Sequence, residues 1–245
     1  MTAQPPDEPF GSLFDDPELE AVFARASPAD TLAAVLTEAR AVLTEVDSPL
    51  DAELWGSDIL AAFGSEPGQA DEIVSAAEQS GTPEALATLR VLGAVGSGSL
   101  RDMASAAAGR LAATGISEPD WAVSVGTPSP GQCWSYGDAA GQQEAVTASF
   151  WYGDQGHVVS VLLDRAQGGG IKNTWVGESG DVLDRTREMA EQDPKMIFEM
   201  ITQADAGGRM HRAIAAGECP QRPEEVSNVA SRRAILQARA ALLKP

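Results

Sequence analysis

The chain has 245 residues, of which 43% are hydrophobic and 22% charged, and this composition is that of an ordinary globular protein. Its two cysteines and two histidines are too few for a disulfide framework or a Cys/His zinc site, so we expect no metal and no cofactor. The formal net charge is −19, and it is uneven, because the first 90 residues hold 18 acids against three arginines. A field of this sign repels phosphate backbones and anionic membranes and attracts cationic partners, so we expect neither direct nucleic-acid binding nor membrane association.

A mobile tail is predicted for residues 1–16, where prolines and acids leave too little apolar surface to order the chain. Phe10, Leu13 and Phe14 are the exception, since three large apolar side chains lie close together there. We treat them as candidate binding residues of a short docking motif. The alternative is that this segment folds back onto its own domain.

Residues 17–125 are predicted to form an acidic helical domain. Helix starts are indicated by Ser27-Pro28, Ser48-Pro49 and Thr82-Pro83, because each pair combines an N-cap hydroxyl with a proline at the first helical position. The apolar spacing predicts five helices, at residues 28–46, 49–63, 69–79, 83–95 and 99–114. A break in the second of them is considered at Gly56.

Residues 126–245 are predicted to form an α+β domain, which begins with the turn-forming segment 126–131. Residues 144–152 alternate in polarity, and a short turn separates them from a second apolar run at 157–163, so the two predict an antiparallel hairpin. Further elements are expected as strands at 133–136 and 171–176 and as helices at 181–192, 194–203, 206–216 and 224–243. The predicted fold class is therefore α+β, with a mainly helical N-terminal half and a small antiparallel β-meander with helices in the C-terminal half.

The C-terminal end of the chain has the opposite charge to its N-terminal third. Between Arg209 and Pro245 the sequence holds seven basic groups and three acids. We expect this end either to lie against the acidic helical half, within one molecule or between two, or to remain exposed to solvent. The arrangement between two molecules leaves a homo-oligomer open.

Candidate catalytic residues gather in one segment of the second half. His157 opens an apolar run, Asp164 ends it, and Lys172 follows three consecutive glycines after one intervening residue. A carboxylate, an ammonium group and free backbone amides are parts of a phosphate-binding or metal-assisted site. The spacing does not match a Walker loop, because Ile171 separates the last glycine from Lys172. The alternative is a glycine-rich turn or bulge in which Asp164 accepts hydrogen bonds from loop amides.

The stretch from Tyr152 to Val176, with Asp164, the glycines and Lys172, resembles an actinobacterial family of uncharacterised proteins in which an alanine-rich helical half precedes this segment. The resemblance covers the C-terminal half of the chain. It implies a bacterial, cytoplasmic protein, and it implies nothing about catalysis, because the family has no assigned activity. Where a second acid is expected just beyond Lys172, this chain has Asn173, which argues against a metal site.

Two functions follow as hypotheses. The first is a non-enzymatic acidic protein-interaction or regulatory protein that binds a basic partner surface, since the negative charge is concentrated and motifs for acyl transfer and zinc proteolysis do not occur. The second is a hydrolase or phosphoryl-transfer enzyme that uses the loop from Asp164 to Lys172, with His157 as base. No segment has the pattern of an export signal or a membrane span, so the expected location is the cytoplasm.

Overall fold

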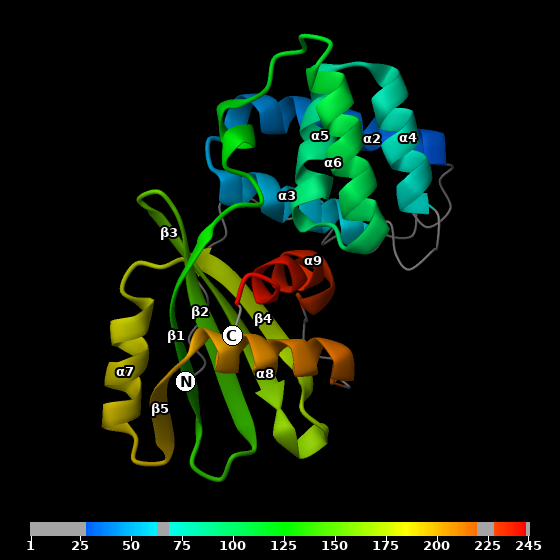
Figure 1. Ribbon diagram of the computed structural model, residues 1–245. Helices are drawn as coiled ribbons and strands as arrows, with labels where there is room; N and C mark the ends of the chain where they lie inside the picture. The colour runs from blue at the N-terminus through cyan, green and yellow to red at the C-terminus, as the bar shows by residue number, and fades with distance from the viewer. Residues whose placement is uncertain (1–27, 63–68, 220–227, 244–245) are drawn as a thin grey trace.

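The computed structural model describes residues 28–62, 69–219 and 228–243, and Figure 1 shows them as two halves in contact. The N-terminal half consists of helices, and the C-terminal half contains an antiparallel sheet with helices. The last described helix, red in Figure 1, lies between the two halves. The α+β fold class predicted from the sequence is confirmed.

The described part of the helical half follows the predicted order closely. Its elements are α2 (Pro28–Glu45), α3 (Pro49–Ala62), α4 (Gln69–Ser80), α5 (Pro83–Val95), α6 (Gly98–Ala112) and the 3-10 helix η1 (Asp120–Val123). Two predicted N-caps are confirmed. The Oγ of Ser48 accepts a hydrogen bond from the backbone N–H of Asp51 (3.1 Å), and the Oγ1 of Thr82 accepts one from that of Ala85 (3.2 Å). Each bond satisfies an N–H group that the first helical turn leaves without a partner.

Helix α5 is the centre of the helical half. Its Leu86, Leu89 and Leu92 are fully buried, and α2, α3, α4 and α6 all pack against it. Helix α3 is continuous through Gly56, so the break considered there is wrong. The missing side chain instead lets α3 and α5 approach, because a Cβ at Gly56 would lie only 2.9 Å from the Cβ of Val91.

The C-terminal half is built on a five-stranded sheet in the order β4-β3-β2-β1-β5, in which neighbouring strands are antiparallel. The strands are β1 (Ser129–Asp138), β2 (Gln143–Tyr152), β3 (Gln155–Asp164), β4 (Gly170–Glu178) and β5 (Met196–Ile201). The predicted hairpin is confirmed, with Phe150 of β2 paired to His157 of β3. Val146, Ala148 and Phe150 line the buried face, as their alternation with polar residues predicts.

The helix predicted at residues 194–203 is wrong. The segment Met196–Ile201 instead forms β5, an edge strand that pairs with β1 from Cys133 to Asp138. Isoleucine and phenylalanine favour an extended chain, and strand pairing supplies hydrogen bonds that a short helix would otherwise make within itself. Long-range pairing thus determines the secondary structure of a segment whose local pattern is ambiguous.

Helices α7 (Val182–Gln192), α8 (Gln203–Ala216) and α9 (Val229–Ala240) complete the described fold. Helices α8 and α9 cover the buried face of the sheet, and α9 also packs against α3 and α5 (Figure 1). The basic end therefore lies against the acidic half within one molecule, and Arg232 of α9 pairs with Asp58 of α3 at 3.0 Å. Apolar contacts join the halves as well, since Val95 of α5 belongs to the core of the sheet half. None of the described helices combines the length and apolar character needed to cross a bilayer.

Two adjacent glycines of α8 provide a test of the packing between α8 and the segment that follows α9. Alanine in place of a helical glycine normally stabilises a helix by about 1 kcal/mol. At Gly207, however, a Cβ would lie 2.5 Å from the carbonyl oxygen of Leu243, and relieving such an overlap costs about 1–3 kcal/mol. At Gly208 the nearest atom is the flexible Nη1 of Arg212, 3.4 Å away. We expect urea unfolding to show Gly207→Ala as destabilised and Gly208→Ala as unchanged or stabilised, and equal effects would contradict this packing.

Candidate functional site

The candidate catalytic residues do not form one site. His157 lies near the start of β3 and Asp164 at its end, and seven steps along a strand place them about 20 Å apart on opposite faces of the sheet. A general base has to lie within hydrogen-bond reach of the proton that it removes. The candidate binding residues Phe10, Leu13 and Phe14 lie outside the described residues.

Asp164 and Lys172 have the structural surroundings that the alternative interpretation predicts. The Oδ1 of Asp164 accepts a hydrogen bond from the backbone N–H of Gln167 (3.1 Å), which caps the short 3-10 helix η2 (Arg165–Gln167). Lys172 lies where the pairing of β3 with β4 becomes irregular. The glycine-rich segment is therefore a turn and a bulge between two antiparallel strands.

The described residues contain no group of three or more histidine, cysteine, aspartate or glutamate side chains that could hold a metal ion. Cys133 and Cys219 are free and buried thiols. Burial raises the pKa of Cys133 to about 11, so this thiol stays protonated at neutral pH. A protonated, buried thiol is a poor nucleophile and a poor metal ligand.

A different set of polar side chains meets where the two halves touch. Glu53 of α3 is fully buried, and both of its carboxylate oxygens accept hydrogen bonds. Its Oε2 accepts from the Nη2 of Arg239 in α9 at 2.5 Å, and its Oε1 accepts from the backbone N–H of Gly126 at 2.6 Å. The Tyr152 hydroxyl of β2 also donates to Oε1. We call Glu53, Tyr152, His157 and Arg239 the junction.

Arg239 is the central member of the junction, and its side chain is only 1% exposed. Its Nε donates to the Nε2 of His157 (3.0 Å), and its Nη2 donates to the Tyr152 hydroxyl oxygen (2.9 Å) as well as to Glu53. The guanidinium carbon lies 5.5 Å from the ring centre of Phe150 and 5.7 Å from that of Tyr152, within cation–π range. An ion pair, hydrogen bonds and two ring faces thus replace the water that a buried arginine loses.

His157 is held neutral in the junction. Burial and, to a lesser extent, the nearby Arg239 lower the pKa of His157 to about 3. Because its Nε2 accepts a hydrogen bond from Arg239, the ring proton is assigned to Nδ1. Burial also raises the pKa of Tyr152, so the phenol keeps its proton and donates it to Glu53. With its basic nitrogen engaged, His157 is not placed to act as a general base.

Helix α3 makes further polar contacts with α9 one turn beyond Glu53. The hydroxyl of Ser57 is buried between the helices, donates to the carbonyl oxygen of Ser231 (2.6 Å) and accepts from the backbone N–H of Ile235 (3.3 Å). The hydroxyl therefore lies between a carbonyl oxygen and an N–H group of α9 that are four residues apart. This contact sets the position of α3 along α9 and its rotation relative to α9.

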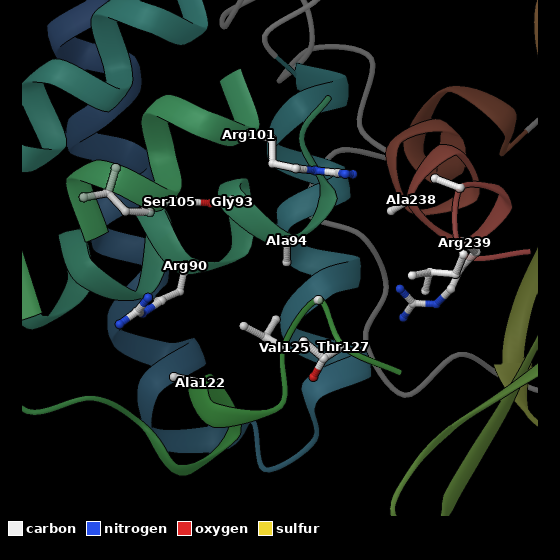
Figure 2. Close-up of a pocket in the computed structure, with 14 residues that line it drawn as sticks. Arg90, Gly93, Ala94, Arg101, Ser105, Ala122, Val125, Thr127, Ala238 and Arg239 are labelled. Atoms are coloured by element: carbon white, nitrogen blue, oxygen red, sulfur yellow. The ribbon is translucent and has the colours of Figure 1, made fainter. Parts of the chain in front are cut away.

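A cleft of about 430 Å³ opens beside the junction and is shown in Figure 2. It lies between α5, α6, the segment 122–127 and α9, and Gly126 and Arg239 belong both to its wall and to the polar contacts of the junction. In Figure 2, the Arg101 side chain extends from α6 toward α9. The described lining includes three arginines, Arg90, Arg101 and Arg239, and no carboxylate.

No sequence motif marks Glu53 or Arg239, and the sequence pattern suggested a different role for His157, that of a base. One signal was available. Arg232, Ile235, Leu236 and Arg239 follow the spacing of a buried helical stripe, so both arginines fall on the apolar side of α9. Arginines in such positions need buried acceptors. Nothing in the pattern indicates which of 36 acids supplies them.

Comparisons with known proteins found no matching family model, no matching curated protein and no matching solved structure. The interpretation of the junction and the cleft rests on their geometry. The resemblance to an actinobacterial family stays a prediction.

The neutral state of His157 predicts a dependence of stability on pH. Its pKa is about 3 in the folded protein and about 6.5 in an unfolded chain. The unfolded chain therefore binds the proton first as the pH falls, and stability is lost from about pH 6.5 downward, by up to about 1.4 kcal/mol per pH unit. We expect that His157→Gln removes the contribution of His157, so that the unfolding free energy falls less steeply between pH 7 and pH 5. His211→Gln, at an exposed position of α8, is the control, and identical slopes in both variants would contradict a buried neutral histidine.

The buried ion pair predicts a large difference between two arginine variants. Arg239→Leu leaves the Glu53 carboxylate buried without its cation, which costs about 3–5 kcal/mol of unfolding free energy. Arg40→Leu removes an ion pair with Glu84 in which the arginine is 77% exposed, and its expected cost is at most about 1 kcal/mol. Denaturant unfolding of both variants measures the difference. Similar costs would show that the junction contributes no more than a surface contact.

Proposed function

We propose that the protein is a non-enzymatic interaction or regulatory protein whose acidic helical half binds a partner with a basic surface. The observation that carries the proposal is the charge left on this half. Within residues 28–62 and 69–125 the sequence places fourteen acids and four arginines, a net charge of −10. A charge of this size steers cationic partners and raises their association rate.

Only some of these carboxylates are neutralised inside the molecule. Five of them form ion pairs with arginines: Glu53, Asp58, Glu78, Glu84 and Glu118. Six others are exposed and have no ion-pair partner among the described residues: Glu45, Asp47, Asp71, Glu72, Asp102 and Asp120. We take the first four, which lie within the strongly acidic first 90 residues, as the acids that a basic partner would meet first. They belong to the end of α2, the turn after it and the first turn of α4.

The alternative function, a hydrolase or phosphoryl-transfer enzyme, gains no support from the geometry. His157 and Asp164 lie at opposite ends of β3, and Asp164 is occupied as a helix cap.

Capture of a partner at two salt concentrations tests the proposal. The tagged protein retains its partner from a native lysate at about 0.1 M salt and loses it at about 1 M, because the screening length falls from about 10 Å to about 3 Å. Mass spectrometry identifies the protein whose retention is salt-dependent, and its dissociation constant is then measured with purified components. A dissociation constant that does not change with salt would contradict the proposal.

A pair of charge-matched variants locates the surface. The first neutralises the four chosen acids of the helical half as Glu45→Gln, Asp47→Asn, Asp71→Asn and Glu72→Gln. The control neutralises four exposed acids of the sheet half as Asp154→Asn, Glu188→Gln, Glu191→Gln and Glu199→Gln. Both variants change the net charge equally, and we expect only the first to weaken binding and to flatten its salt dependence. Equal losses would mean that net charge alone, rather than this half, attracts the partner.

A further inference from the structure

The cleft beside the junction differs in charge from the surface around it. The chain has 36 acids and 17 basic residues, yet the described lining of the cleft has three arginines and no carboxylate. Arg90 is neutralised, because its guanidinium pairs with Glu118. Arg239 is paired as well, with Glu53, so Arg101 of α6 is the lining arginine that has no carboxylate partner among the described residues.

Arg239 has donor capacity that the junction does not use. Its Nε and Nη2 are engaged by His157, Glu53 and Tyr152, whereas Nη1 makes no hydrogen bond to a described residue. The side chain as a whole is only 1% exposed. Because Arg239 also lines the cleft, Nη1 is the nitrogen of this guanidinium that is left to donate to a ligand there.

Arg101 faces the cleft from the opposite side. Its Nε donates to the carbonyl oxygen of Gly96 at 2.9 Å, which holds the side chain in place. The two terminal nitrogens have no hydrogen-bond partner among the described residues, and Figure 2 shows the side chain directed toward α9. Guanidinium groups held in this way are suited to the planar oxygens of a carboxylate or a phosphate.

The remaining lining determines what kind of anion fits. Seven of its fourteen residues are apolar, and the others are polar, charged or glycine: the apolar ones are Leu89, Ala94, Ala122, Val125, Ala238, Ala241 and Leu242. A volume of about 430 Å³ lies within the range of small-molecule sites, which combine apolar walls with a few placed polar groups. An inorganic ion would make no contact with these apolar side chains.

We propose that this cleft binds a small organic anion, with a carboxylate or phosphate head between Arg101 and Arg239 and an apolar body against the walls. The proposal goes beyond the proposed function, because it assigns a second ligand to a different part of the molecule. The anion would connect α6 to α9 and offset the charge of Arg101, which has no carboxylate partner among the described residues. It would therefore stabilise the contact between the two halves.

Titration calorimetry and thermal unfolding of the full chain test the proposal with four probes: hexanoate, hexyl phosphate, inorganic phosphate and hexylammonium. We expect saturable binding and a raised Tm with at least one of the two hexyl anions, weaker binding of inorganic phosphate and none of hexylammonium. The hexyl anion that binds more tightly identifies the head group. Failure of both hexyl anions, or equal binding of hexylammonium, would overturn the proposal. If inorganic phosphate binds as tightly as hexyl phosphate, the inference that the ligand is organic is overturned.

Two arginines of α6 distinguish a built site from general charge attraction. Arg101→Gln removes the cleft guanidinium, and we expect the dissociation constant of the bound hexyl anion to rise about tenfold or more. Arg110→Gln removes the same charge from a residue that is 62% exposed and paired with Glu78, and we expect no more than a small change. Circular dichroism checks that both variants are folded. Equal weakening by both substitutions would show that the anion senses only net charge, and the site would be rejected.

Discussion

The buried ion pair between Glu53 and Arg239 is the constraint on which the arrangement of the two halves depends. Both side chains are removed from water, so the pair is tolerated only when every charged oxygen and most N–H groups have partners. Those partners come from the loop before β1, from β2 and from β3, through Gly126, Tyr152 and His157. A helix from each half and the sheet must therefore meet at one position, and a rotation of either half would leave a buried charge unpaired.

This constraint also determines how much of the acidic charge remains available. Helix α9 brings Arg232 and Arg239 against α3, where they pair with Asp58 and Glu53. The basic end thus neutralises part of the acidic half, and exposed carboxylates remain at the end of α2, in the turn after it and in the first turn of α4. A basic partner would be attracted to these carboxylates over a long range before local contacts form.

The sequence predicted the elements whose signals are local. Prolines after hydroxyl residues marked the starts of α3 and α5, and alternation marked β2, because capping and periodicity act within a few neighbouring residues. Strand β5 was wrongly predicted as a helix. Its stability comes from pairing with β1, about sixty residues earlier in the chain, and the local pattern does not show this pairing. The junction was not predicted, because its contacts also join residues that are far apart in the sequence. Glu53 and Arg239 are 186 positions apart, and neither carries a motif.

The position of the cleft would give the junction a role beyond stability if the proposed anion binds there. Arg239 neutralises Glu53 and also lines the cleft, so a bound anion and the buried carboxylate would share one cation. Anything that draws Arg239 toward the cleft acts directly on Glu53, and through α3 on the helical half whose surface acids are proposed to meet the partner. Two sites that bias one shared contact are coupled, and the coupling is reciprocal by necessity. The anion and the basic partner should therefore change each other's affinity by the same factor if both bind.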